Sequence, residues 1–304
     1  MLNVLGIAWR WAAFVKLSHT VFALPFALVA MVVAARDERG WPGWRTFGLI
    51  LLAMVSARTC AMTFNRIADR DLDRANPRTA LRHLPAGQVS LAGAWTLWAL
   101  SAAGLAVAGF FLNPICLYLS PLALVVVCFY SLTKRFTDFT HVFLGLALAL
   151  APLGGWLAVK GGFVLWPLQE SALLPLLLAA AVVFWLIGFD VIYALQDYEF
   201  DRQHGRHSLV VRWGADNALK AAFLAHMLMF GFLAAFGLLS RFRVPYFVGM
   251  AIIGASLMLE HWLARKRSLK WINTAFFRLN ALVSVVFLAV VVVEVVFPYF
   301  RVRR

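Results

Sequence analysis

The chain has 304 residues, of which 63% are hydrophobic and only 14% are charged, and its mean hydropathy is +0.82. A soluble domain has roughly a quarter of its residues charged, so this composition excludes one and indicates an integral membrane protein. The formal net charge is +14. In a membrane protein a basic excess indicates cytoplasmic loops facing anionic membrane lipid, and we expect no nucleic-acid partner.

Apolar segments of spanning length predict an all-α, multi-pass membrane protein with nine transmembrane helices. Residues 2–16 precede them and resemble an interfacial helix on the membrane surface. We expect no cleavable signal peptide, so that the first span is retained. The predicted spans are residues 18–36, 44–68, 90–111, 115–133, 141–159, 172–196, 218–240, 244–264 and 275–298.

The distribution of Lys and Arg sets the expected orientation. With the N-terminus in the cytoplasm, the cytoplasmic segments carry 18 basic residues and the opposite side carries 9. Because cytoplasmic loops are enriched in Lys and Arg, we expect the N-terminus and the loops after the even-numbered spans in the cytoplasm, in a plasma (inner) membrane. The basic tail opposes this bias, with Arg301, Arg303 and Arg304.

The second span ends in an acidic stretch in which Asn65, Asp69 and Asp73 are spaced by four residues. If the helix continues to Asp73, all three side chains point to one side. The sixth span ends in the same spacing, with Asp197 and Asp201. Carboxylates so arranged repel each other without a cation, and Mg²⁺ prefers oxygen ligands, so we expect these aspartates to bind Mg²⁺. The alternative is ordinary pairing with neighbouring arginines, which are Arg66, Arg70, Arg74 and Arg202.

An internal repeat relates the two stretches. A shift of 128 residues places Asp69 and Asp73 on Asp197 and Asp201, and the arginines that follow also coincide. Membrane proteins commonly use repeats to bring equivalent helix ends around one site. We therefore expect a single domain over residues 1–304, with the acidic stretches facing each other across one cytoplasmic cavity. Its parts would be two pseudo-repeats, about 18–133 and 141–264, and a ninth helix at 275–298.

Two charged residues lie two helical turns deeper than the acidic stretches. Arg58 precedes Asn65 by seven residues, and Asp190 precedes Asp197 by seven, so each lies on nearly the same helix face. Arg58 could bind a diphosphate oxygen or a substrate carboxylate. Asp190 could orient a substrate hydroxyl or remove a ring proton. The two could instead pair with each other, because buried charges are usually matched.

Lys134 and Arg135 close the fourth span, where alone they indicate a membrane-interface anchor. Tyr130 lies one turn deeper on the same helix, and Tyr193 lies between Asp190 and Asp197. Tyrosines in such places more often pack than catalyse.

These motifs resemble those of the UbiA superfamily of intramembrane prenyltransferases. The first family motif matches Asn65, Asp69 and Asp73, and the loop after it matches Arg78, Thr79, Arg82, Leu84 and Gly87. The second matches Asp190, Tyr193, Ala194, Asp197 and Asp201, followed by Gly205 and Ser208. The Y-x-x-x-K-R motif matches Tyr130, Lys134 and Arg135. One departure is His83, which occupies the usual proline position of the first loop.

The resemblance implies a central cavity capped by the two acidic loops, in which two Mg²⁺ ions bridge a polyprenyl diphosphate and an aromatic acceptor attacks the allyl cation. The implied metal ligands are Asp69, Asp73, Asp197 and Asp201. The implied substrate-binding residues are Asn65, Arg78, Lys134, Arg135, Tyr130 and Arg206. The implied catalytic residues are Asp190, Asp197, Tyr193 and Arg58.

The acceptor is inferred from a narrower likeness. The stretches K-L-S-H-T-V-F-A-L-P-F-A, F-N-R-I-A-D-R-D-L-D and I-Y-A-L-Q-D resemble the 4-hydroxybenzoate polyprenyltransferase-like branch, and within it the members associated with menaquinone made through futalosine. We expect a hydroxybenzoate-type aromatic acid, in ubiquinone or menaquinone biosynthesis. The alternatives are another acceptor (hydroxynaphthoate, haem or chlorophyllide) or a membrane transporter with intramembrane carboxylates.

Overall fold

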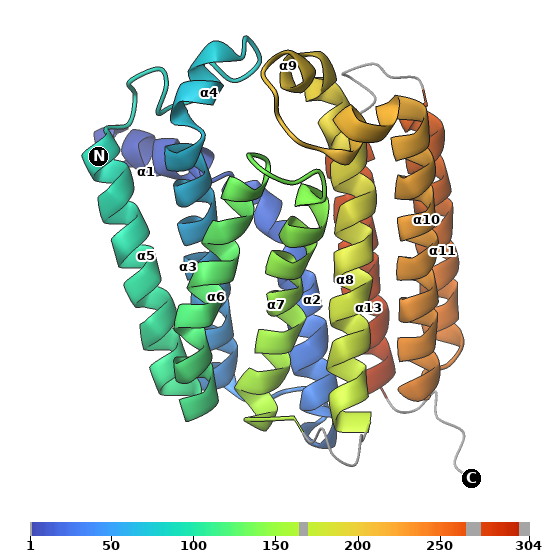
Figure 1. Ribbon diagram of the computed structural model, residues 1–304. Helices are drawn as coiled ribbons and strands as arrows, with labels where there is room; N and C mark the ends of the chain where they lie inside the picture. Colours follow the sequence, from blue (N-terminus) through green and yellow to red (C-terminus); the bar gives the residue numbers. More distant parts are fainter. Residues whose placement is uncertain (1, 164–169, 266–274, 298–304) are drawn as a thin grey trace.

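The computed structural model describes residues 2–163, 170–265 and 275–297, and every regular element in these ranges is helical (Figure 1). Within them, nine helices are long and apolar enough to cross a membrane, which confirms the predicted fold class. These helices are α2 (Thr20–Ala34), α3 (Trp44–Ala68), α5 (Leu91–Leu112), α6 (Pro114–Thr133), α7 (Thr140–Lys160), α8 (Glu170–Ala194), α10 (Leu209–Leu239), α11 (Val244–Ala264) and α13 (Asn280–Val296). The predicted end of the ninth span at 298 and the basic tail lie outside the described residues.

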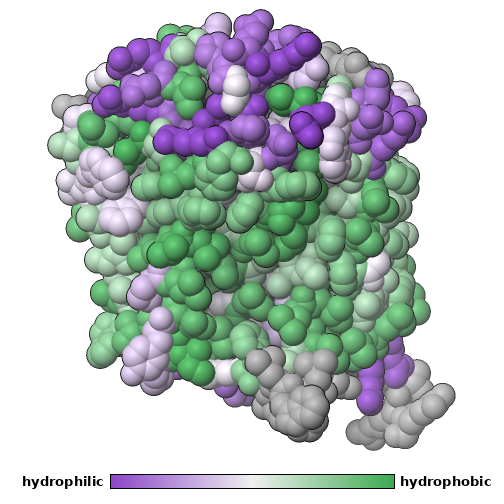
Figure 2. Space-filling view, viewed as in Figure 1, coloured by the Kyte–Doolittle hydropathy of each residue, from purple (hydrophilic) through white to green (hydrophobic). Residues whose placement is uncertain are grey.

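Helix α1 (Leu2–Phe14) lies across the bundle near the end that carries α4 and α9 (Figure 1). Phe14 and Val15 are buried against Leu84 and Val89 of the loop that precedes α5, whereas Trp9 is 74% exposed. Burying an apolar face against the loop while exposing an indole is what an interfacial helix requires. Figure 2 shows the matching surface, with an apolar belt below a hydrophilic cap.

The predicted seventh span, 218–240, was wrong at its start, because α10 begins at Leu209. Ser208 caps the helix by accepting a hydrogen bond from the Val211 backbone N–H, and Gly214 then breaks it with φ 75° and ψ 161°. Glycine adopts this positive φ without a steric penalty. Polar residues around this break, Arg212, Asp216 and Asn217, interrupt the apolar run, so hydropathy alone placed the helix start too late.

The second predicted span, 44–68, matches α3, and the condition that the helix continues to Asp73 is not met. Helix α3 ends at Ala68, Asp69 has φ −96° and ψ 9°, and α4 (Arg70–Ala75) follows. Helix α8 likewise gives way to the 3₁₀ turn η3 (Leu195–Asp197) and to α9 (Tyr198–Gln203). Helix α9 therefore begins and ends 128 residues after α4, the same offset as the sequence repeat. The division into two pseudo-repeats stays a prediction.

The apolar core and the cavity meet at α2, α7 and α8, where Phe22, Leu186 and Phe189 belong to both. The core packs large side chains of α2, α8, α10 and α13, among them Phe26, Trp185, Phe236 and Phe287. Helices α2 and α7 cross closely at Gly155, where a Cβ atom would overlap the backbone of Ala27. Only 17–22% of the α3, α5 and α6 spans is buried, against 61% for α8. Helices α3, α5 and α6 thus form a thin wall on one side of the cavity described next.

Candidate active site

A cavity of about 520 Å³ lies among α2, α3, α5, α6, α7 and α8, beneath the loops that follow α3 and α8. Its polar end is lined by both acidic stretches. It continues between apolar side chains such as Leu112, Leu157 and Phe163. Leu112 ends α5, Leu157 lies in the last turn of α7, and Phe163 follows α7, so all three lie far from the acidic stretches along the length of these helices. The cavity therefore combines a charged head region with an apolar tunnel of nearly membrane thickness.

All but one of the site residues expected from the sequence line this cavity. They are Arg58, Asn65, Asp69, Asp73, Arg78, Tyr130, Lys134, Asp190, Tyr193, Asp197, Asp201 and Arg206. The exception is Arg135, whose Nη2 donates a hydrogen bond of 2.7 Å to the carbonyl of Ala68. Arg135 thus caps the C-terminus of α3, where a cation is favourable, and its binding of a diphosphate stays a prediction.

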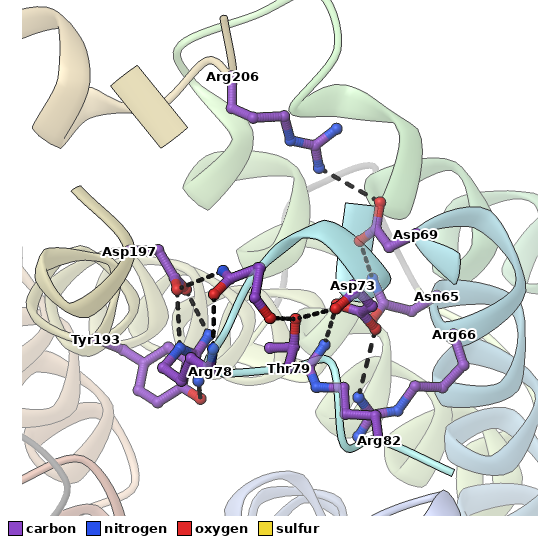
Figure 3. Close-up of polar contacts among 11 residues, drawn as sticks. Asn65, Arg66, Asp69, Asp73, Arg78, Thr79, Arg82, Tyr193, Asp197 and Arg206 are labelled. Atoms are coloured by element: carbon purple, nitrogen blue, oxygen red, sulfur yellow. Dashed lines mark hydrogen bonds and ion pairs between the residues drawn. The ribbon is translucent and has the colours of Figure 1, made fainter. Parts of the chain in front are cut away.

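The loop after each acidic stretch reaches a carboxylate of the other stretch (Figure 3). Arg78 donates from Nε to Asp197 Oδ1 at 2.8 Å and from Nη2 to Asp197 Oδ2 at 2.5 Å. Its Nη1 also donates to the Tyr193 hydroxyl at 3.1 Å. In the other direction, Arg206 Nη2 donates to Asp69 Oδ1 at 3.3 Å. The two acidic stretches therefore lie at the same end of the bundle and share one site.

Asp73 is held by the loop that follows it. Arg82 Nη1 donates to Asp73 Oδ1 at 2.6 Å, and Arg66 Nη1 lies 3.9 Å from Oδ2. Thr79 Oγ1 donates to the Asp73 carbonyl at 2.9 Å. Asn65 Nδ2 donates to Asp69 Oδ2 at 3.3 Å. Within the described part of the chain, Arg66 is the only one of the four neighbouring arginines of the sequence-based alternative that contacts one of the four aspartates. The other cations come from the loops.

Burial and charge set the ionisation of the groups outside the spans. Burial raises the pKa of Asp69, and Arg206 and Lys134 partly oppose this rise. Burial would lower the pKa of Arg78, but its contacts with Asp197 and Tyr193 raise it overall. The site is thus a dense network in which each carboxylate depends on a nearby cation.

The carboxylates suit a hard divalent cation in their chemistry. No group of three or more His, Cys, Asp or Glu side chains is gathered as a metal site within the described ranges, and arginines contact Asp69, Asp73 and Asp197 instead. However, the four aspartates and Asn65 offer only oxygen ligands to one cavity, and Asp73 Oδ2 is buried without a hydrogen bond. These residues therefore fit Mg²⁺, provided that Arg78 and Arg206 exchange partners.

The ion pair considered for Arg58 and Asp190 is not formed. Arg58 Nη2 instead donates to the Lys16 carbonyl at 3.3 Å, and Asp190 Oδ2 lies 2.6 Å from His141 Nδ1. Lys16, Asn76 and His141 were not predicted from the sequence. Asn76 Nδ2 donates to Asp197 Oδ1 at 3.2 Å. Asn76 and Lys16 adjoin motifs recognised in the sequence, so both could have been proposed as site residues from the sequence. His141 begins an apolar run that carries no such motif.

The geometry agrees with comparisons to known proteins. A model of the UbiA prenyltransferase family matches residues 23–282. The chain is 31% identical over 264 residues to a 4-hydroxybenzoate octaprenyltransferase of Aromatoleum aromaticum, covering 85% of each chain. It is 30% identical over 290 residues to another of Alkalilimnicola ehrlichii, covering 92% of this chain and 93% of that one.

Solved structures show the same architecture. The apo structure of a UbiA homolog from Aeropyrum pernix has a TM-score of 0.81 at 33% identity, over 91% of this chain and 98% of that one. A UbiA homolog from Archaeoglobus fulgidus bound to GPP and Mg²⁺ has a TM-score of 0.68 at 22% identity, over 93% and 99%, and it supports the fold. With its two facing acidic stretches inside nine membrane-spanning helices, the chain belongs to the UbiA prenyltransferase family and is a prenyltransferase.

Proposed function

We propose that this enzyme transfers a polyprenyl group from a polyprenyl diphosphate to 4-hydroxybenzoate or a closely similar aromatic acid, in the biosynthesis of a quinone. The observation that carries the proposal is the single cavity that joins four aspartates and several arginines to a long apolar tunnel. A charged head and an apolar tail are the two parts of a polyprenyl diphosphate. The relatives named 4-hydroxybenzoate octaprenyltransferase support the acceptor.

The diphosphate would bind at the polar end. Asp69, Asp73, Asp197 and Asp201 would hold Mg²⁺, which when bound neutralises the charge of the leaving diphosphate. Arg78, Arg206 and Lys134 would donate hydrogen bonds to the same phosphates, because cations near a leaving group stabilise the charge that develops there. Arg78 would then leave Asp197 for a phosphate oxygen. The arginines would thus pair with the carboxylates before substrate binds and move to the phosphates afterwards.

The acceptor would bind deeper, beside Arg58 and Asp190. Arg58 presents a buried guanidinium whose Nε has no hydrogen-bond partner, and it suits the carboxylate of an aromatic acid. In the reaction the allylic C–O bond breaks with its electron pair on the diphosphate, and a ring π pair forms the new C–C bond. The ring proton then leaves to a base, for which Asp190 is our candidate. Apolar walls such as Leu148 and Phe189 exclude water from the allyl cation.

We also propose that the acidic loops face the cytoplasm, in the plasma (inner) membrane of a bacterial cell. The excess of Lys and Arg in the loops at that end supports this orientation.

The test is an assay with purified protein, Mg²⁺, a labelled polyprenyl diphosphate and a panel of aromatic acids. We expect prenylation of 4-hydroxybenzoate and no product in excess chelator. Prenylation of a hydroxynaphthoate alone would reassign the acceptor. No product with any aromatic acid would overturn the proposal.

A further inference from the structure

His141 lies on α7 directly behind the cavity wall. Its side chain is fully buried, and it is not among the residues that line the cavity. Its Nδ1 lies 2.6 Å from Oδ2 of Asp190, which does line the cavity from α8. His141 therefore contacts the candidate base without reaching the space in which a substrate would lie.

The hydrogen-bond chemistry of this pair fixes its polarity. An ionised carboxylate only accepts hydrogen bonds, so His141 Nδ1 carries the proton and donates it to Asp190. The other ring nitrogen, Nε2, is buried and has no partner. A buried polar atom without a hydrogen bond is costly, so packing alone would favour an apolar residue at this position. The contact with Asp190 is the interaction that offsets this cost.

The contact also determines which oxygen of Asp190 stays available. Oδ2 is occupied by His141, whereas no hydrogen bond of Oδ1 occurs within the described residues, and Oδ1 is not among their buried, unpaired atoms. With its side chain 15% exposed and lining the cavity, Asp190 therefore presents Oδ1 to a ligand there. A single strong donor on one oxygen holds a carboxylate in one orientation.

The other cations near Asp190 also interact with other groups. Lys134 acts electrostatically on Asp190, but it also acts on Asp69, Asp197 and Asp201. Tyr130 and Arg58 lie in the same region, and Arg58 is hydrogen-bonded to the Lys16 carbonyl. His141 is thus the donor dedicated to Asp190.

We propose that His141 is a positioning residue that holds Asp190 ionised and oriented, so that Asp190 Oδ1 takes the ring proton released by the aromatic acceptor. The ring C–H bond breaks, its electron pair restores the aromatic ring, and the proton forms the O–H bond of Asp190. This inference rests on the proposed function and adds to it the residue on which the base depends.

The experiment compares His141→Leu, which removes the donor, with His141→Asn, which keeps an amide N–H that can reach Asp190. Steady-state kinetics are measured with both substrates varied, using the acceptor that the wild-type protein prenylates. We expect His141→Leu to lower turnover about ten- to hundredfold, as for loss of a charge-assisted hydrogen bond, with KM for the polyprenyl diphosphate unchanged. We expect His141→Asn to recover at least half of this loss on a logarithmic scale.

His226→Leu is the matched control. His226 is also fully buried and hydrogen-bonded, to His261 and to the Trp185 carbonyl, but it lies outside the cavity lining; its replacement should leave turnover within about twofold of wild type. Three results would each overturn the inference: unchanged turnover in His141→Leu, a rise in its KM for the diphosphate as large as its fall in turnover, or no recovery of turnover in His141→Asn. Turnover by the wild-type protein would still uphold the proposed function. A wild-type protein without turnover on any aromatic acid would overturn both.

Discussion

Arg78 and Asp197 form a bidentate contact between the two halves of the chain, with N–O distances of 2.8 and 2.5 Å. Arg78 comes from the loop after α4 and Asp197 from the turn η3 that follows α8, 119 residues apart. A planar guanidinium matches a carboxylate and a phosphate equally well. The contact therefore links the two acidic stretches, and in the proposed function Arg78 would bind a phosphate oxygen once the substrate is present.

We expect Arg78→Ala to weaken binding of the polyprenyl diphosphate. The loss of a charge-assisted hydrogen bond is worth about 1.5–3 kcal/mol, so KM for the diphosphate should rise roughly ten- to hundredfold at saturating Mg²⁺. The matched control is Arg70→Ala, because Arg70 pairs only with the exposed Asp71 among the described contacts and does not line the cavity. A KM for the diphosphate that changes equally in both variants would contradict the expectation.

The aspartates of both stretches should be essential. We expect Asp69→Ala and Asp197→Ala each to reduce turnover by at least about 10³-fold, or about 4 kcal/mol, if they hold the ion that stabilises the leaving group. Asp71→Ala in the same stretch should remain active, since the Asp71 side chain is 78% exposed. Turnover is measured with Mg²⁺ and with excess chelator, and near-normal turnover in chelator would refute the metal dependence.

Features that depend on one segment of sequence were predictable. The nine spans followed from hydropathy, and the shared cavity followed from the repeat and the loop charges. The i, i+4 pattern alone did not decide whether the helix continues through Asp69, because the pattern is equally compatible with a break. That break is stabilised by distant groups, among them Arg206 on Asp69.

Pairing across elements was not predictable in the same way. Arg58 and Asp190 lie at the same depth on two helices, but they do not contact each other. Arg58 contacts Lys16, which lies between α1 and α2, and Asp190 contacts His141 of α7. His141 lies at the start of the fifth apolar run, just after Asp138 and Thr140, where a polar residue is ordinary and indicates nothing about its partner. The transporter alternative also could not be dismissed from composition, and membership of the UbiA family decides against it.

The proposed orientation predicts opposite labelling of two exposed positions. Asp71→Cys lies beside the acidic site, and Glu38→Cys lies in the turn between α2 and α3 at the other end. In spheroplasts, a membrane-impermeant maleimide should label Glu38→Cys at once and Asp71→Cys only after lysis. The native cysteines, Cys60, Cys116 and Cys128, lie within spans and serve as the background. The reverse pattern would invert the orientation.

Lys16 should make stability depend on pH. It lies between α1 and α2, and burial, together with nearby arginines such as Arg66 and Arg82, lowers its pKa from 10.5 to about 7. Between these two values the unfolded chain binds the proton and the folded protein does not. The free energy of unfolding should therefore rise with pH from about 7 to about 10.5, and the cost of the buried charge is fully present below pH 7.

Lys16→Met removes this titration and tests it. One pKa unit corresponds to about 1.4 kcal/mol. Partial exposure of the side chain screens part of the effect, so the variant should be more stable than wild type by on the order of 2–4 kcal/mol at pH 6. The difference should shrink steadily as the pH approaches 10. Chemical unfolding in detergent from pH 6 to pH 10 measures both proteins, and parallel stability curves would show that Lys16 stays charged in the folded protein.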